Sequence, residues 1–134
     1  MKIIVAGLTL LVLACGPAAW AQDPTAPSSK RCAAVYGAFA QEQGAFGTTD
    51  SLMGERYFNY PKINFDDREA QLAAKSEMGV TDLKSASATD QADFYMKLVD
   101  AETEGDMDVD AVRAMIRLSD TCDAEYGFSP SLGG

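Results

Sequence analysis

The side chains with the clearest potential for chemistry lie in an acidic segment in the second half of the chain. Carboxylates alternate with other residues along this segment, at Asp100, Glu102, Glu104, Asp106 and Asp108. Carboxylate oxygens are the ligands that calcium and other hard divalent cations prefer. The spacing therefore makes these residues a candidate metal site, with calcium as the candidate cofactor.

The segment resembles the calcium loop of an EF-hand in part of its pattern. Asp100, Glu102 and Glu104 fall at positions 1, 3 and 5 of that loop. Gly105 falls at position 6, but Ala111 stands at position 12, where an EF-hand has the Glu that binds calcium through both oxygens. The alternative is an acidic turn between two helices, in which Gly105 ends one helix and an Asp caps the next.

The absence of histidine narrows the chemistry further. The chain contains none, which excludes Ser-His-Asp and Cys-His catalysis, histidine-based zinc sites and covalent haem attachment. Carboxylate pairs are inevitable among twenty acidic residues, so they do not indicate an active site. We therefore expect a protein that is not an enzyme.

A second candidate site is an aromatic stretch within a long, glycine-containing connection at residues 44–65. It contains Arg56, Tyr57, Phe58 and Tyr60, and Tyr and Arg are enriched among the residues that contribute most to protein–protein binding. These side chains are a candidate partner-binding surface. The alternative is that the rings fill the core of a small domain whose second helix offers mostly alanine.

The N-terminus has the three parts of a secretory signal peptide. Lys2 precedes an apolar run over residues 3–14, and Ala19-Trp20-Ala21 is a small-x-small cleavage site. We expect residues 1–21 to be removed and the protein to be periplasmic or secreted. In the alternative interpretation, Cys15 ends a bacterial lipoprotein signal and carries a lipid anchor.

The charge balance limits the partners. The net charge is −9, and removal of Lys2 with the signal peptide leaves −10. This argues against nucleic acid and against anionic lipid surfaces, which both require basic residues. The apolar run is also shorter than the roughly 20 residues that a membrane-spanning helix needs. The candidate partners that remain are an unknown protein and a cation.

Two cysteines remain after the signal peptide, Cys32 and Cys122. In an oxidising compartment they allow a single pairing. A disulfide that closes a loop of about 90 residues stabilises a domain by roughly 4 to 5 kcal/mol in the chain-entropy model. We therefore predict a Cys32–Cys122 bond that contributes a large share of the total stability.

Apolar spacing predicts four helices. They cover residues 29–43, residues 66–78, a third segment that starts at Thr89 or Asp90, and a fourth segment from about 108 to 126. Asp66 and Glu69 resemble a capping box for the second helix, and residues 80–88 are expected to form a loop or a weak helical turn.

These elements predict an all-α fold, a small up-down bundle of about four helices closed by one disulfide. An even number of helices brings the start of the first beside the end of the fourth, where the two cysteines lie.

The predicted organisation is a signal peptide at 1–21, a disordered lead-in at 22–29, a helical domain at 30–127 and a tail at 128–134. We expect an exported accessory, adaptor or inhibitor module, with a calcium-binding module as the alternative.

Overall fold

The computed structural model describes residues 26–46, 54, 57, 59–103, 109–129 and 132. The predicted signal peptide, Cys15 and much of the 44–65 connection lie outside these residues. None of the helices in the described ranges is long and apolar enough to cross a membrane.

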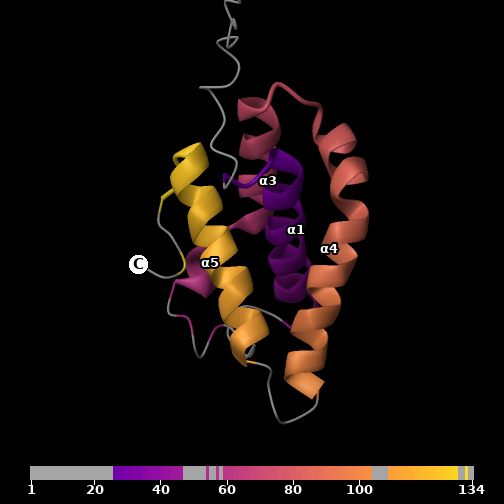
Figure 1. Ribbon diagram of the computed structural model, residues 1–134, viewed down its shortest axis with the longest axis vertical. Coiled ribbons are helices and arrows are strands. Elements are labelled where there is room, and N and C mark those ends of the chain that lie inside the picture. The colour runs from indigo at the N-terminus through magenta and orange to yellow at the C-terminus, as the bar shows by residue number, and fades with distance from the viewer. Residues whose placement is uncertain are drawn as a thin grey trace, which may run out of the picture.

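Four α-helices pack as an up-down bundle (Figure 1). They are α1 (Ser29–Phe46), α3 (Phe65–Lys75), α4 (Val80–Thr103) and α5 (Val109–Tyr126), and the short 3₁₀ helix η2 (Tyr60–Lys62) precedes α3. In Figure 1, α1 and α4 run downward while α3 and α5 run upward, and α1 lies between α4 and α5. The predicted fold class is confirmed.

The disulfide joins the first helix to the last, as predicted. Cys32 lies near the start of α1 and Cys122 near the end of α5, with their Cα atoms 5.7 Å apart. Both side chains are fully buried. The up-down order and the bond are therefore consistent with one another, because the bundle brings together residues separated by 90 positions.

The centre of the core is a cluster of aromatic rings. Phe39 lies 5.1 Å from Phe65 and 5.9 Å from Tyr60, measured between ring centroids. Tyr60 is fully buried, and its hydroxyl donates a hydrogen bond to the Phe39 carbonyl oxygen at 3.1 Å. Tyr60 is therefore a core residue, which agrees with the alternative interpretation for this one ring of the aromatic stretch.

The start of α3 differs from its prediction. The cap is Asn64, whose side-chain oxygen accepts a hydrogen bond from the Asp67 backbone N–H at 3.1 Å. The predicted capping box of Asp66 and Glu69 is wrong, because Asn64 already provides a cap in extended backbone conformation. Glu69 is instead buried, with its Oε2 atom 3.4 Å from Lys84 Nζ.

The prediction of a loop or weak helical turn at residues 80–88 is also corrected, because α4 begins at Val80 and continues without interruption to Thr103. Leu83 and Ser87 are buried within this part of the helix. The residues here are mostly weak helix formers, so tertiary packing rather than local propensity stabilises this part of α4. That packing is against α1, the helix with which α4 makes its most extensive contact.

The two ends of the bundle also differ slightly from expectation. α1 continues past its predicted end at residue 43 to Phe46. At the other end α5 ends at Tyr126, as predicted, and is followed by Gly127 with a φ of +70°. The predicted tail then returns to the protein, since Phe128 packs against the core and Leu132 is only 4% exposed.

Candidate functional site

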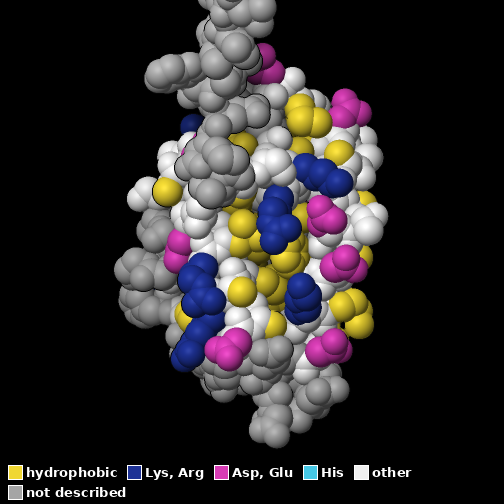
Figure 2. Space-filling view, in the orientation of Figure 1, with side chains coloured by type: hydrophobic (Ala, Val, Ile, Leu, Met, Phe, Trp, Pro, Cys, Tyr) yellow, Lys and Arg dark blue, Asp and Glu magenta, His cyan; other side chains and the backbone are white. Residues whose placement is uncertain are grey.

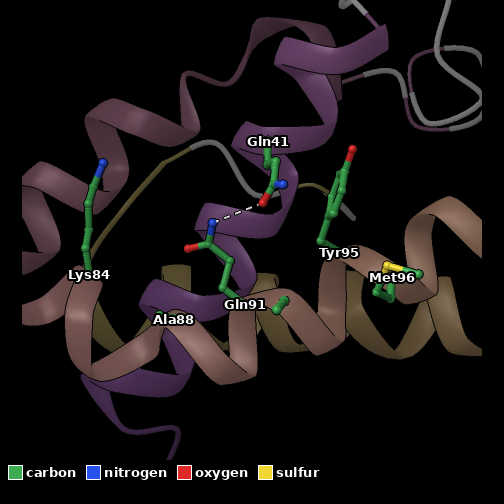
Figure 3. A pocket seen from close by; sticks show the side chains of 7 residues that line it. Gln41, Lys84, Ala88, Gln91, Tyr95 and Met96 are labelled. Atoms are coloured by element: carbon green, nitrogen blue, oxygen red, sulfur yellow. Dashed lines mark hydrogen bonds between the residues drawn. The ribbon is translucent and has the colours of Figure 1, made fainter.

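The described surface contains an open groove where α1 crosses α4 (Figure 3). It encloses about 350 Å³. Its lining is mostly uncharged and comes from one residue of α1 and six of α4: Gln41, Lys84, Ala88, Gln91, Ala92, Tyr95 and Met96.

Two glutamine side chains meet between the helices at this groove. Gln91 Nε2 donates a hydrogen bond to Gln41 Oε1 at 3.3 Å. Gly37 makes this position possible, because a Cβ atom added there would overlap the Gln91 carboxamide and lie 2.6 Å from its Cδ. The glycine therefore has a packing role, and the amide pair depends on it.

The two ends of the groove differ chemically. Met96 at one end has a side chain that is 53% exposed, one of the few large apolar groups in the described chain with that much contact with water. At the other end Lys84 forms its ion pair with the buried Glu69 of α3. Burial raises the pKa of Glu69, and the nearby Lys84 charge opposes that rise. The groove thus combines an apolar end, a central amide pair and a neutralised cation.

A second cluster of polar groups lies in the interior. Arg68 Nη1 donates to both carboxylate oxygens of Asp123, at 2.8 and 2.7 Å. The Tyr36 hydroxyl donates to the same carboxylate at 2.7 Å. The guanidinium carbon also lies 5.8 Å from the ring centroids of Tyr36, Phe65 and Phe128.

This interior cluster is built for structure rather than for reaction. Tyr36 is fully buried and Asp123 is 1% exposed, so a substrate cannot reach either group. Burial and the hydrogen bond to Asp123 raise the pKa of Tyr36, which keeps its phenol neutral and unable to act as a base at physiological pH. Burial also raises the pKa of Asp123, against the opposing hydrogen bonds from Tyr36 and Arg68. The cluster cross-links α1, α3 and α5 beside the disulfide.

The predicted metal residues fall at the edge of the described chain or beyond it. Asp100 is exposed on α4, whereas the segment 104–108 lies outside the described residues and the side chain of Glu102 is not described either. Among the residues that the structure does describe, no three His, Cys, Asp or Glu side chains are grouped to hold a metal ion. The calcium hypothesis stays a prediction.

The predicted partner-binding residues are similarly divided. Arg56 and Phe58 lie outside the described residues, Tyr57 is half-buried, and Tyr60 belongs to the core. The partner-binding hypothesis for this stretch therefore stays a prediction. The groove is formed by other residues.

Sequence patterns contained a signal for the interior cluster but only a weak one for the groove. Asp123 follows Cys122 and lies four positions after Ser119 on the apolar stripe of the last helix, where an acid is unexpected. Gln41 and Gln91 are polar residues on predicted helices and resemble any solvent-facing side chain. Only the contact of α1 with α4 distinguishes them.

Comparison of the chain with protein-family models, with curated proteins and with solved structures found no match. The interpretation of the groove therefore rests on its own geometry and chemistry.

Proposed function

We propose that this protein is an exported, non-enzymatic module that binds another protein through the groove between α1 and α4. The observation that carries the proposal is the position of Met96, 53% exposed at the end of a groove that also contains an amide pair. Flexible, polarizable methionine side chains are used at surfaces that adapt to protein partners.

The lining matches a peptide segment. A carboxamide both donates and accepts hydrogen bonds, as a peptide group does, and Gln41 and Gln91 place two of them side by side. Ala88 and Ala92 leave room for an apolar side chain of the partner. The volume of about 350 Å³ is near the lower end of the usual range for binding pockets, about 300 to 1,000 Å³, and suits a short segment.

Two features support the exported location. The sequence at residues 1–21 has the pattern of a signal peptide. Disulfides persist in oxidising compartments and are rare in the cytosol, and this chain has one that joins its first and last helices. A small exported domain that binds rather than catalyses is consistent with the absence of histidine.

Site-specific photo-crosslinking in the native exporting cell tests the proposal. A photoreactive amino acid at position 96 is expected to form a covalent adduct with one partner protein. Ala92→Arg, which places a bulky charge in the groove, should remove that adduct. The matched control is Ala124→Arg on α5, because Ala92 and Ala124 are both exposed helical alanines; it should leave the adduct intact.

Two outcomes contradict the proposal. One is the absence of any adduct from position 96 in cells that export the chain. The other is an adduct that forms equally from Glu125, which is exposed on α5. Mass spectrometry of the mature chain from the same cells shows whether residues 1–21 have been removed or Cys15 carries a lipid.

A further inference from the structure

A pair of cations converges on one aromatic ring at the side of the bundle. The guanidinium carbon of Arg31 lies 5.6 Å from the ring centroid of Phe94, and Nζ of Lys97 lies 5.5 Å from the same centroid. The two charges therefore lie within about 11 Å of each other. Both cationic residues are exposed, and the ring beneath them is 8% exposed.

Neither cation is neutralised by an ion pair with a described residue, in contrast to Lys30, Arg68, Lys84 and Arg113. Asp93 precedes Lys97 by four positions, a spacing that permits a helical ion pair, yet Lys97 is placed over Phe94 instead. In a chain with a net charge of −9, these two cations thus share one aromatic ring and form no ion pair within the described structure.

The position of Arg31 also works against the stability of its own helix. α3, α4 and α5 each have acidic residues in the first turn, where the helix dipole favours negative charge. α1 has none and carries Lys30 and Arg31 there. Local rules that a sequence breaks without a structural gain tend to mark functional positions.

The face of the bundle between α5 and α4 carries both apolar and basic side chains. Figure 2 shows hydrophobic side chains gathered between α5 and α4, with Lys and Arg side chains around them. Phe94 and Lys97 lie on a different side of α4 from Ala88 and Ala92, because each residue adds about 100° around the helix. This surface is thus separate from the groove.

We propose that Arg31 and Lys97, held over Phe94, form a docking site for a segment of a partner protein that carries at least two carboxylates. Carboxylates two or three residues apart on an extended chain are spaced by about 7 to 10 Å, which lies within the upper limit of about 11 Å that the two ring distances set for the cations. Partners with many negative charges are disfavoured, since charges that reach past the pair meet the acidic remainder of the protein. A short acidic segment stays close to the pair, within the Debye length of about 8 Å at physiological ionic strength.

Titration of the ¹⁵N-labelled, disulfide-bonded chain with the end-blocked peptide Gly-Glu-Gly-Glu-Gly, which carries two carboxylates, followed by NMR, tests this site. We expect saturable shifts of the Phe94 amide and of the Arg31 side-chain N–H, which weaken as salt is added. Arg31→Glu with Lys97→Glu should weaken binding by about tenfold or more, because favourable charge pairs become repulsive. Arg31→Glu also places an acid in the first turn of α1, so unfolding does not account for the loss.

The control is Lys62→Glu with Lys75→Glu, which changes the net charge equally at two exposed lysines and leaves this pair intact. It should leave the affinity within about twofold, because neither lysine is one of the two cations over Phe94. Equal weakening in both double variants overturns the proposal, as does the absence of saturable shifts at millimolar peptide. Concentration-dependent shifts at Phe94 without peptide would assign the surface to a second copy of the chain and also reject it. Loss of the adduct from Met96 has no bearing on this result, so the two proposals fail independently.

Discussion

Arg68 and Asp123 are 55 residues apart in the sequence, and in the interior one guanidinium nitrogen of the arginine lies within 2.8 Å of both oxygens of the aspartate. The arginine side chain is 6% exposed and the aspartate side chain 1% exposed. Both charges are largely removed from water there, and their hydrogen bonds offset part of the cost of burial. The bond connects α3 to α5 next to the disulfide that connects α1 to α5.

Removal of one partner from this pair should therefore lower the free energy of unfolding. We expect Asp123→Ala to lower the free energy of unfolding by about 3 to 5 kcal/mol, because it removes the carboxylate that accepts hydrogen bonds from both Arg68 and Tyr36 in the interior. The combined variant Arg68→Met, Asp123→Leu and Tyr36→Phe should retain most of the stability, since it replaces the whole cluster with apolar groups. Denaturant unfolding followed by circular dichroism measures both, and a loss below about 1 kcal/mol for Asp123→Ala would contradict the argument.

Tyr36 should make the protein sensitive to alkali. Burial raises the pKa of its phenol in the folded state, whereas the unfolded chain titrates near the usual value of about 10. Above that pH the unfolded state binds fewer protons, so stability falls by up to about 1.4 kcal/mol per pH unit. Tyr36→Phe should be less stable at neutral pH, because Asp123 loses a hydrogen bond, but should show a shallower decline above pH 10. Parallel slopes for the two proteins would exclude Tyr36 as the cause.

Glu69 should make the stability of the protein depend on pH in the acidic to neutral range. Burial raises its pKa, so the folded protein holds a proton on this group at pH values where the unfolded chain has lost it. The stability contributed by the protonated form is present in acid and is lost as pH rises through the folded pKa. Glu69→Gln should therefore be more stable than the natural chain at neutral pH, with a smaller difference in acid. Lys84 remains hydrated in this variant, because its side chain is 51% exposed.

Thermal unfolding at several pH values measures this difference. Glu125→Gln is the control, because Glu125 is exposed on α5; a surface change of this kind should alter stability by less than about 0.5 kcal/mol. If Glu69→Gln is instead less stable than the natural chain at neutral pH, the ion pair with Lys84 outweighs the cost of burial.

The parts of the fold that were predictable are those in which large apolar residues set the period. On α5, Val112, Met115 and Ile116 are all buried, and their spacing gave the correct helix. The pairing of the two cysteines followed from their number, and the predicted helix order agreed with it, because it places them at the same end of the bundle. Sequence alone therefore predicted the bundle and the bond that closes it.

The errors occurred where a contact between helices depends on small or polar residues. The first half of α4 contains Ser85, Ala86, Ser87 and Ala88, which show no apolar period, and helix formation there depends on packing against α1. The groove was missed for the same reason. Gln91 on α4 packs against Gly37 on α1, and neither residue alters the apolar pattern of its own helix.

Reduction of the disulfide should leave a marginally stable domain. The bond between Cys32 and Cys122 spans 90 positions, for which the loss of chain entropy corresponds to about 4 to 5 kcal/mol. We expect Cys32→Ala with Cys122→Ala to lower the free energy of unfolding by up to that amount. Both sulfurs are buried, so reduction of the natural chain should accelerate when mild denaturant opens the fold. A rate of reduction that does not depend on denaturant would show that the bond is accessible in the native state.

Gly37→Ala separates helix propensity from the geometry of the groove. Propensity alone predicts a gain of about 1 kcal/mol for this change within a helix. The new Cβ, however, would overlap the Gln91 carboxamide, which is the far end of a flexible side chain. We expect Gln91 to swing away and lose its 3.3 Å hydrogen bond to Gln41, so that the net change in stability is below about 1 kcal/mol.

The side-chain amide resonances of Gln41 and Gln91 report this movement by NMR, and Gly37→Ala should also remove the partner adduct from Met96. Gly44→Ala is the matched control on the same helix, because its added Cβ would meet no atom within 4 Å. It should gain stability by about 0.5 to 1 kcal/mol and leave both amides unchanged. A loss of more than about 2 kcal/mol in Gly37→Ala would mean that α1 and α4 cannot keep their spacing. In that case the glycine is required for the bundle itself, and the amide pair is secondary to it.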